Sequence, residues 1–206
     1  MSKKIMFNDK FGLTQAVLDG RKTMTRRIFY IPDKLVPYLD IDDIFDIVDD
    51  CIIWKDKSDN FRMTFEPKYK VGEVVAIAQS YSDCGNMPDY GLDEDCYPIM
   101  PKRSGFFNKM FVKADLMPHH IEITGIKVER LQDISDEDCL KEGIIRYTKD
   151  ETVYKYDLSD GFEMLGWGNM KRNPKDAFAC LIDKVSGKGV WESNPFVFVY
   201  EFKLID

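Results

Sequence analysis

The stretch Gly20-Arg21-Lys22-Thr23-Met24-Thr25-Arg26-Arg27 holds the clearest concentration of basic residues in the chain. Leu13, Ala16 and Val17 precede it at helical spacing, and Gly20 stands where a left-handed C-cap would end that helix. We therefore predict a short helix followed by a basic loop. A solvated face is the usual explanation for such a cluster, and a ligand site is the alternative.

Short strand-like runs lie on both sides of this stretch. We expect strands at Lys3–Phe7, in an antiparallel hairpin within 44–65 that turns at Lys57–Asn60, and at Val74–Ile77, Met110–Val112, Ile121–Val128 (with a bulge at Gly125) and Phe196–Phe202. Two further helices are predicted, from Ser135 to Gly143 and from Asn173 to Gly187. Strands flanking a few helices, without a βαβ alternation, indicate a mixed α+β fold around a small barrel.

The region of about 82–108 has no sustained hydrophobic period and is rich in glycine, proline and acidic residues. We interpret it as an inserted loop, a candidate flap over the site, and not as a linker between domains. The chain is therefore expected to be a single domain spanning 1–206.

Composition narrows the classes of protein that the chain can belong to. A net charge of −7 would repel a polyanion, so a nucleic-acid site has to be a local basic patch or a pocket for one nucleotide. The N-terminus lacks the apolar run of a signal peptide, and no membrane span is expected, which predicts a cytoplasmic protein. Five widely spaced cysteines and two adjacent histidines predict reduced cysteines, no metal and no cofactor.

The basic stretch resembles the G-x-K-x-x-T-x-R motif of the ASCH family, with Gly20, Lys22, Thr25 and Arg27 at the fixed positions. The segments 69–75, 128–144 and 191–199 are also similar to the longer, phage- and bacterial-type members of that family. Together these segments extend the resemblance, in order, over roughly four fifths of the chain.

The resemblance implies a PUA-like small mixed or antiparallel β-barrel, flanked by short helices, with a cleft beside the motif. It implies RNA or a modified nucleoside or nucleotide as partner, in RNA metabolism or translation-linked regulation. Some proteins that share only the core are amidohydrolases that remove the acetyl group from acetylcytidine. By position, their lysine, threonine and glutamate correspond to Lys22, Thr25 and Glu142.

Elementary chemistry provides a partial check on this set. A threonine hydroxyl is a poor nucleophile until a base accepts its proton, and a lysine is a base only when its pKa falls far below 10.4. A spacing of three places Lys22 and Thr25 side by side only on a turn. Glu142, just before Gly143, lies where the helix dipole disfavours a negative charge, and a cation such as Lys22 would remove that difficulty. Solvent exposure of Glu142 is the alternative.

Other candidate ligand-binding residues are Gly20, Arg21, Arg26, Arg27, Gln79, Arg130 and Trp167. Arg26 and Arg27 are suited to bidentate bonds to a phosphate or carbonyl, although an ion pair is an equal alternative for Arg26. Arg130 fits a structural salt bridge better. Gln79 stands where relatives often carry an Arg-Glu pair, and its neutral amide cannot act as a base. Trp167, between two glycines, is the preferred base-stacking candidate.

Three hypotheses result. The leading one is a binding module for RNA or a modified nucleoside or nucleotide, because a fold by itself never establishes catalysis. The alternative is a hydrolase that uses Lys22, Thr25 and Glu142 on an acylated nucleoside. A third is an interaction protein of phage or mobile-element origin.

Overall fold

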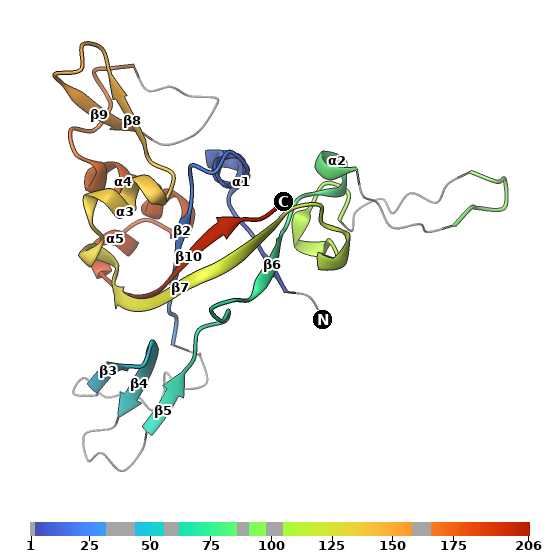
Figure 1. Ribbon diagram of the computed structural model, residues 1–206, viewed down its shortest axis with the longest axis horizontal. Helices are drawn as coiled ribbons and strands as arrows, with labels where there is room; N and C mark the ends of the chain where they lie inside the picture. The colour runs from blue at the N-terminus through green and yellow to red at the C-terminus, as the bar shows by residue number, and fades with distance from the viewer. Residues whose placement is uncertain (1–2, 32–43, 56–61, 86–90, 98–104, 158–165) are drawn as a thin grey trace.

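The computed structural model describes residues 3–31, 44–55, 62–85, 91–97, 105–157 and 166–206. A five-stranded sheet forms its centre, in the order β1-β6-β7-β10-β2 (Figure 1). Only β1 and β6 run parallel, and every other neighbouring pair is antiparallel. The strands are β1 (Lys4–Ile5), β2 (Met24–Ile28), β6 (Val74–Ile77), β7 (His120–Arg130) and β10 (Phe196–Leu204).

The structure confirms the predicted α+β class. Among the described strands the sheet is open, with β1 and β2 at its two edges, so no closed barrel is formed by them. One side-chain hydrogen bond connects the two edges. Arg27 Nη2 of β2 donates to the carbonyl of Met6, just after β1, at 2.6 Å. We call this place the seam.

Strand β10 lies between β7 and β2, and this central position explains its continuous run of apolar residues. Four consecutive residues, Val197 to Tyr200, are buried, as expected for a strand covered on both faces. The predicted bulge is confirmed: Glu201 pairs with Gly125 and Phe202 with Ile123, so that Thr124 is left without a partner.

Two small sheets accompany the central one. The first contains β3 (Ile44–Val48), β4 (Cys51–Lys55) and β5 (Arg62–Phe65), and the second is the hairpin of β8 (Ile145–Thr148) and β9 (Tyr154–Asp157). The region 44–65 thus holds three strands, where two were predicted. The missed turn is Asp49-Asp50, whose φ angles of 48° and 61° fit a two-residue type I′ turn. The predicted turn at Lys57–Asn60 lies outside the described residues.

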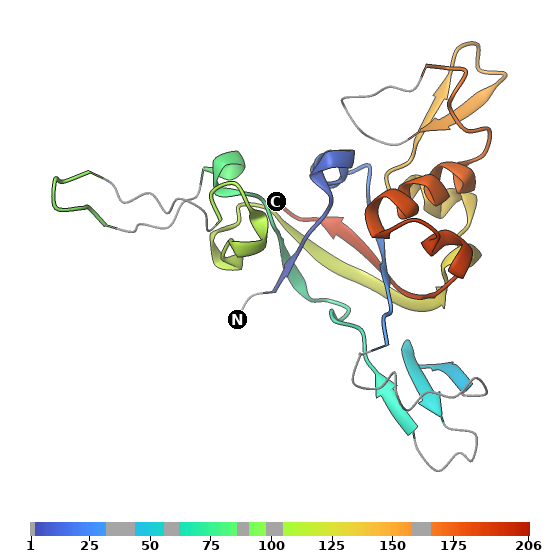
Figure 2. The same ribbon diagram turned by 180° about the vertical axis from the view of Figure 1, so that it is seen from behind.

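The helices are α1 (Leu13–Leu18), α2 (Tyr81–Cys84), α3 (Asp136–Lys141), α4 (Pro174–Ser186) and α5 (Val190–Ser193), with 3₁₀ turns at Asp9–Phe11, Lys109–Phe111, Ala114–Leu116 and Leu131–Asp133. Both predicted N-caps are confirmed: Ser135 Oγ accepts from the Asp138 amide at 3.1 Å, and Asn173 Oδ1 from the Asp176 amide at 2.7 Å. In Figure 2, β2 runs between α1 and α4.

Two predictions of local structure are wrong. Met110–Val112 is not a strand, because Asn108 caps a 3₁₀ turn there by accepting from the Met110 amide at 3.0 Å. The basic cluster is not wholly a loop, because Met24–Ile28 forms β2 by pairing with β10. Within the predicted insertion, the described part includes most of α2 and residues 91–97, which lie far from the sheets in Figure 1.

Candidate functional site

The segment between α1 and β2 is held by backbone hydrogen bonds. Gly20 has φ +71°, and the amides of Arg21 and Lys22 both donate to the carbonyl of Ala16, at 2.9 and 2.8 Å. The Thr23 amide then donates to the Lys141 carbonyl at the end of α3, at 2.9 Å. These bonds place Lys22 against α3 before β2 begins.

Lys22 and Glu142 form a buried ion pair, so pairing with a cation is the one observed of the two alternatives left open for Glu142. Lys22 Nζ lies 2.6 Å from Glu142 Oε2, and their residues are 2% and 4% exposed. Lys22 Nζ also donates to the carbonyls of Glu142 and Met24, at 2.8 and 2.7 Å. Burial lowers the pKa of Lys22, although the charge of Glu142 opposes this effect. Three acceptors use the full donor capacity of the ammonium group.

Arg26 forms ion pairs with three carboxylates. Its Nη2 lies 2.6 Å from Glu129 and 3.1 Å from Asp138, and its Nη1 lies 3.1 Å from Glu142. Burial would lower the pKa of Arg26, but the charge of Glu142 and a hydrogen bond to Glu129 raise it overall. The ion-pair alternative for Arg26 is therefore the one observed, and Glu142 joins Arg26 to Lys22.

A cavity of ≈ 430 Å³ opens beside these residues, with Lys22, Thr25, Glu142 and Arg27 in its lining. The apolar face of α4 contributes Phe178, Leu181 and Ile182, and the exposed ring of Tyr30 also lines the cavity. A mostly apolar cavity of this size with a few polar groups is typical of a small-molecule site. We call it the motif cavity.

Thr25 reaches the motif cavity from within β2. The turn expected between Lys22 and Thr25 is absent, because Thr25 already pairs with Tyr200 of β10. Lys22 precedes the strand, so strand alternation does not fix its direction, and both side chains line the cavity. Within the described part of the chain, Thr25 Oγ1 has no hydrogen-bond partner, yet it is not among the fully buried unpaired atoms. Thr25 is 5% exposed, and its hydroxyl keeps its hydrogen-bonding capacity for a ligand in the cavity.

Arg27 differs from Arg26 in lacking a carboxylate. Burial lowers the pKa of Arg27, and its guanidinium lies 5.6 Å from the Phe7 ring centroid. Apart from the bond to Met6, Arg27 donates to no described residue, and none of its nitrogens is a fully buried unpaired atom. Arg27 thus retains N–H groups that can bind a ligand.

The other predicted residues lie elsewhere or contribute little. Arg21 is exposed and pairs with Asp19 at 3.1 Å, while Gly20 serves the backbone turn. Gln79, Arg130 and Trp167 are not among the residues that line the motif cavity. The guanidinium of Arg130 lies 3.7 Å from the Phe196 ring centroid, and Trp167 is contacted by Lys149 and Lys155. Gln79 Oε1 is buried without a partner among the described residues.

Sequence reasoning did not place Tyr30 or the apolar face of α4 at the motif cavity. Tyr30 gave no signal, because an aromatic residue within the apolar run that follows the basic stretch has no distinctive pattern. The apolar face of α4 was predicted from its helical period, but its position opposite Lys22 depends on how α4 packs against β2 and α3.

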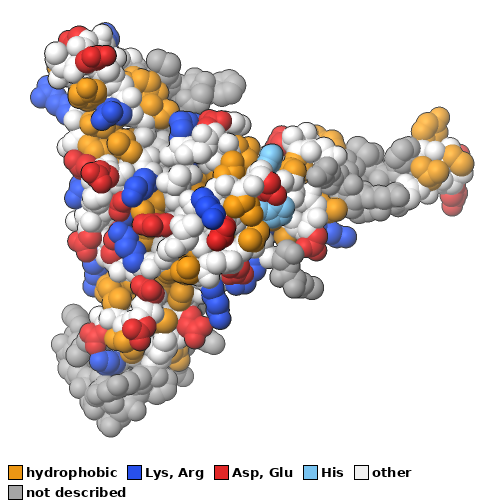
Figure 3. Space-filling model, viewed as in Figure 1, with side chains coloured by type: hydrophobic (Ala, Val, Ile, Leu, Met, Phe, Trp, Pro, Cys, Tyr) orange, Lys and Arg blue, Asp and Glu red, His pale blue; other side chains and the backbone are white. Residues whose placement is uncertain are grey.

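Figure 3 shows Lys and Arg interspersed with Asp and Glu over the visible face, without a continuous basic track. All five cysteines are free. In the described part of the chain, no group of three or more His, Cys, Asp or Glu side chains is arranged to hold a metal ion. None of the described helices combines the length and the apolar character that crossing a membrane requires.

The fold and site define an α+β protein with a Lys–Thr–Glu-lined cavity at an open sheet edge. Comparison with protein-family models, with curated proteins and with solved structures finds no match for this chain. The ASCH resemblance of the motif therefore stays a prediction.

Proposed function

We propose that the chain binds a modified nucleoside or nucleotide in the motif cavity, in RNA metabolism or translation-linked regulation in the cytoplasm. The observation that carries the proposal is that Lys22, Thr25 and Arg27, three of the four motif positions, line one cavity opposite an apolar helix face. The ≈ 430 Å³ volume suits a ligand of nucleoside size. The motif's resemblance to a family associated with RNA supplies the ligand class.

The available groups support recognition of a polar, aromatic ligand. Thr25 Oγ1 and the spare N–H groups of Arg27 offer hydrogen bonds, and Tyr30, which is 67% exposed, offers a ring for stacking on a base. Lys22 and Arg26 act differently, because carboxylate and carbonyl oxygens already occupy their donors. They hold the wall of the cavity in place.

Hydrolysis of an acylated nucleoside is the second candidate, favoured by Lys22, Thr25 and Glu142 lining the same cavity. In this mechanism Thr25 Oγ1 attacks the acyl carbon while neutral Lys22 Nζ accepts the hydroxyl proton. Lys22 then returns the proton to the leaving amine, and water hydrolyses the acyl ester on Thr25. Burial of Lys22, which lowers its pKa, favours this candidate.

The hydrogen bonds of Lys22 favour binding over catalysis. An ammonium group with three acceptors has no lone pair to direct at Thr25. Catalysis therefore requires a proton to leave Lys22, and Glu142 at 2.6 Å is the nearest carboxylate to accept it. Binding needs no such transfer.

One experiment tests both candidates. Cytidine, N4-acetylcytidine and other acylated nucleosides are titrated by calorimetry, and chromatography follows release of the acyl group. We expect binding of a modified nucleoside, weakened by Thr25→Val by about three- to tenfold, as for one lost hydrogen bond. Thr64→Val, an exposed threonine of β5, is the matched control.

The outcomes separate the candidates. Binding without release of the acyl group removes the hydrolase, whereas release that disappears in Thr25→Val supports it. If neither a nucleoside of the panel nor its phosphorylated form binds, the proposed function fails.

A further inference from the structure

A second cavity of ≈ 380 Å³ lies at the seam between β1 and β2. Lys4 and Met6 line it from β1 and the residue after it, and Arg27 and Ile28 line it from β2. Arg27 and Ile28 also line the motif cavity. The two cavities therefore share a boundary at Arg27, whose guanidinium connects the two open edges of the sheet. We call the second one the seam cavity.

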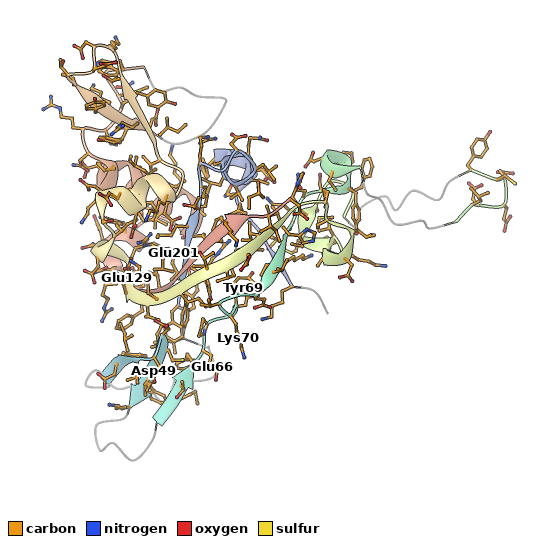
Figure 4. All side chains as sticks on the ribbon, viewed as in Figure 1. Asp49, Glu66, Tyr69, Lys70, Glu129 and Glu201 are labelled. Atoms are coloured by element: carbon orange, nitrogen blue, oxygen red, sulfur yellow. The ribbon has the colours of Figure 1, made fainter. Side chains whose placement is uncertain are left out.

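The charge of the seam cavity is the opposite of the molecule's net charge. Three cations, Lys4, Arg27 and Lys68, line it together with one carboxylate, Glu66, in a chain of net charge −7. Figure 4 shows Glu66 and Tyr69 along the segment that leaves β5 toward β6. Cations gathered in a concave site raise the local concentration of an anion even when the net charge is negative.

Of these three cations, Arg27 and Lys68 have N–H donors without a partner among the described residues, whereas the Lys4 ammonium group is held by two carbonyls. Lys4 Nζ is engaged by the carbonyls of Met110 and Val112, at 2.7 and 2.6 Å. Lys68 is exposed, and among the residues that the structure describes its Nζ has no hydrogen-bond or ion-pair partner, only the Tyr69 ring at 5.3 Å. With the spare N–H groups of Arg27, Lys68 forms a pair of unneutralised cations at one cavity. Arg26, one residue away on the opposite face of β2, is neutralised by three carboxylates.

Hydrogen bonds and a ring contact hold the wall behind these cations. Tyr69 Oη donates to the Lys4 carbonyl at 3.0 Å, and the Lys68 amide donates to Tyr200 Oη at 2.9 Å. The Tyr69 and Tyr200 rings meet edge to face at 5.2 Å. Burial raises the pKa of Tyr69 to about 12, so the phenol stays neutral and adds no repulsion toward an anion. The cavity is thus preformed.

We propose that the seam cavity binds a phosphate group of the ligand whose base occupies the motif cavity, with Arg27 and Lys68 as the phosphate contacts. The proposal rests on the proposed function and names its ligand class: a nucleotide or a short single strand, in preference to a free nucleoside. Arginine suits this role because its planar fork matches a phosphate, and at ≈ 380 Å³ the cavity also has room for the adjoining sugar.

The test compares N4-acetylcytidine and cytidine with their 5′- and 3′-monophosphates, with dinucleotides that contain them, and with inorganic phosphate. Calorimetry at low salt is expected to show a phosphorylated form binding about tenfold more tightly than the nucleoside. Lys68→Ala is expected to remove most of this gain and to leave nucleoside binding unchanged. Lys70→Ala, which removes an exposed lysine two positions away and outside the seam cavity, is the matched control.

The results distinguish this proposal from the proposed function. Equal affinity for nucleoside and phosphorylated forms, or equal effects of Lys68→Ala and Lys70→Ala, overturns the phosphate site and leaves the motif cavity as a nucleoside site. If phosphate binds and the nucleoside does not, the proposal that one ligand occupies both cavities is overturned. If neither nucleoside nor nucleotide binds, both proposals fail. If a dinucleotide binds more tightly than a mononucleotide, the ligand is a strand. If the mononucleotide binds more tightly, the ligand is a mononucleotide.

Discussion

Arg26 and Arg27 are adjacent in the chain yet have different environments. Strand alternation turns Arg26 toward β7 and α3, where Glu129 of β7, Asp138 of α3 and Glu142 just after α3 neutralise it. Arg27 faces the opposite side, where its hydrogen bond goes to the Met6 carbonyl. The same residue type therefore holds the fold together at one position and is available to a ligand at the next.

Glu142 is the residue that joins two buried cations, Lys22 and Arg26. Loss of one buried partner leaves an uncompensated charge, so we expect Lys22→Met to lower the free energy of unfolding by about 3–5 kcal/mol. Urea denaturation measures this change. Lys203→Met is the control, because Lys203 pairs with Glu122 at 2.9 Å on the surface, where a pair contributes about 0–1 kcal/mol. Equal losses in the two variants would contradict the structural role of the buried network.

Among the elements, α4 has the clearest dual role. Its apolar face packs into the core and also lines the motif cavity through Phe178, Leu181 and Ile182. Its bounds were predictable, since Asn173 and Gly187 flank a clear helical period. Strand β2 was not, because Met24–Ile28 has no alternation of its own and becomes a strand by pairing with β10.

The N-cap of α4 gives a prediction at the same scale. Asn173→Ala removes the acceptor of the Asp176 amide and should lower the stability to urea by about 1 kcal/mol. Asn169→Ala changes an exposed asparagine outside any helix and serves as the control. If the two variants have the same midpoint, the cap does not stabilise α4.

At the scale of the whole molecule, ion pairs link elements that are distant in sequence. Arg26 joins β2 to β7 and α3, and Lys3 joins the N-terminus to Glu73 beside β6. The sheet itself stays open between β1 and β2, where the two cavities meet. Because ion pairs hold the region around the two cavities, the stability of this region depends on the charge of the paired groups.

Stability should therefore fall in acid. Burial alone would raise the pKa of Asp138, but hydrogen bonds from Arg26 and the charge of Lys127 hold it below its usual value. A carboxyl whose pKa is lower in the folded state stabilises above its unfolded pKa of about 3.9, and the contribution is lost as the pH falls through the folded pKa. We expect urea midpoints to drop below about pH 4, less steeply in Asp138→Asn. An identical slope in the variant would contradict this assignment.

The α+β class, the main helices and the caps could be read from the sequence alone, which also favoured a cationic partner for Glu142 over solvent exposure. Each of these follows from local physics: side-chain period, capping hydrogen bonds and the helix dipole. Three features came from the three-dimensional packing: Arg26 is neutralised and Arg27 is not, α4 faces Lys22, and the sheet stays open at the seam. These features depend on which face of β2 meets which neighbour, and that is fixed by packing between segments far apart in the chain.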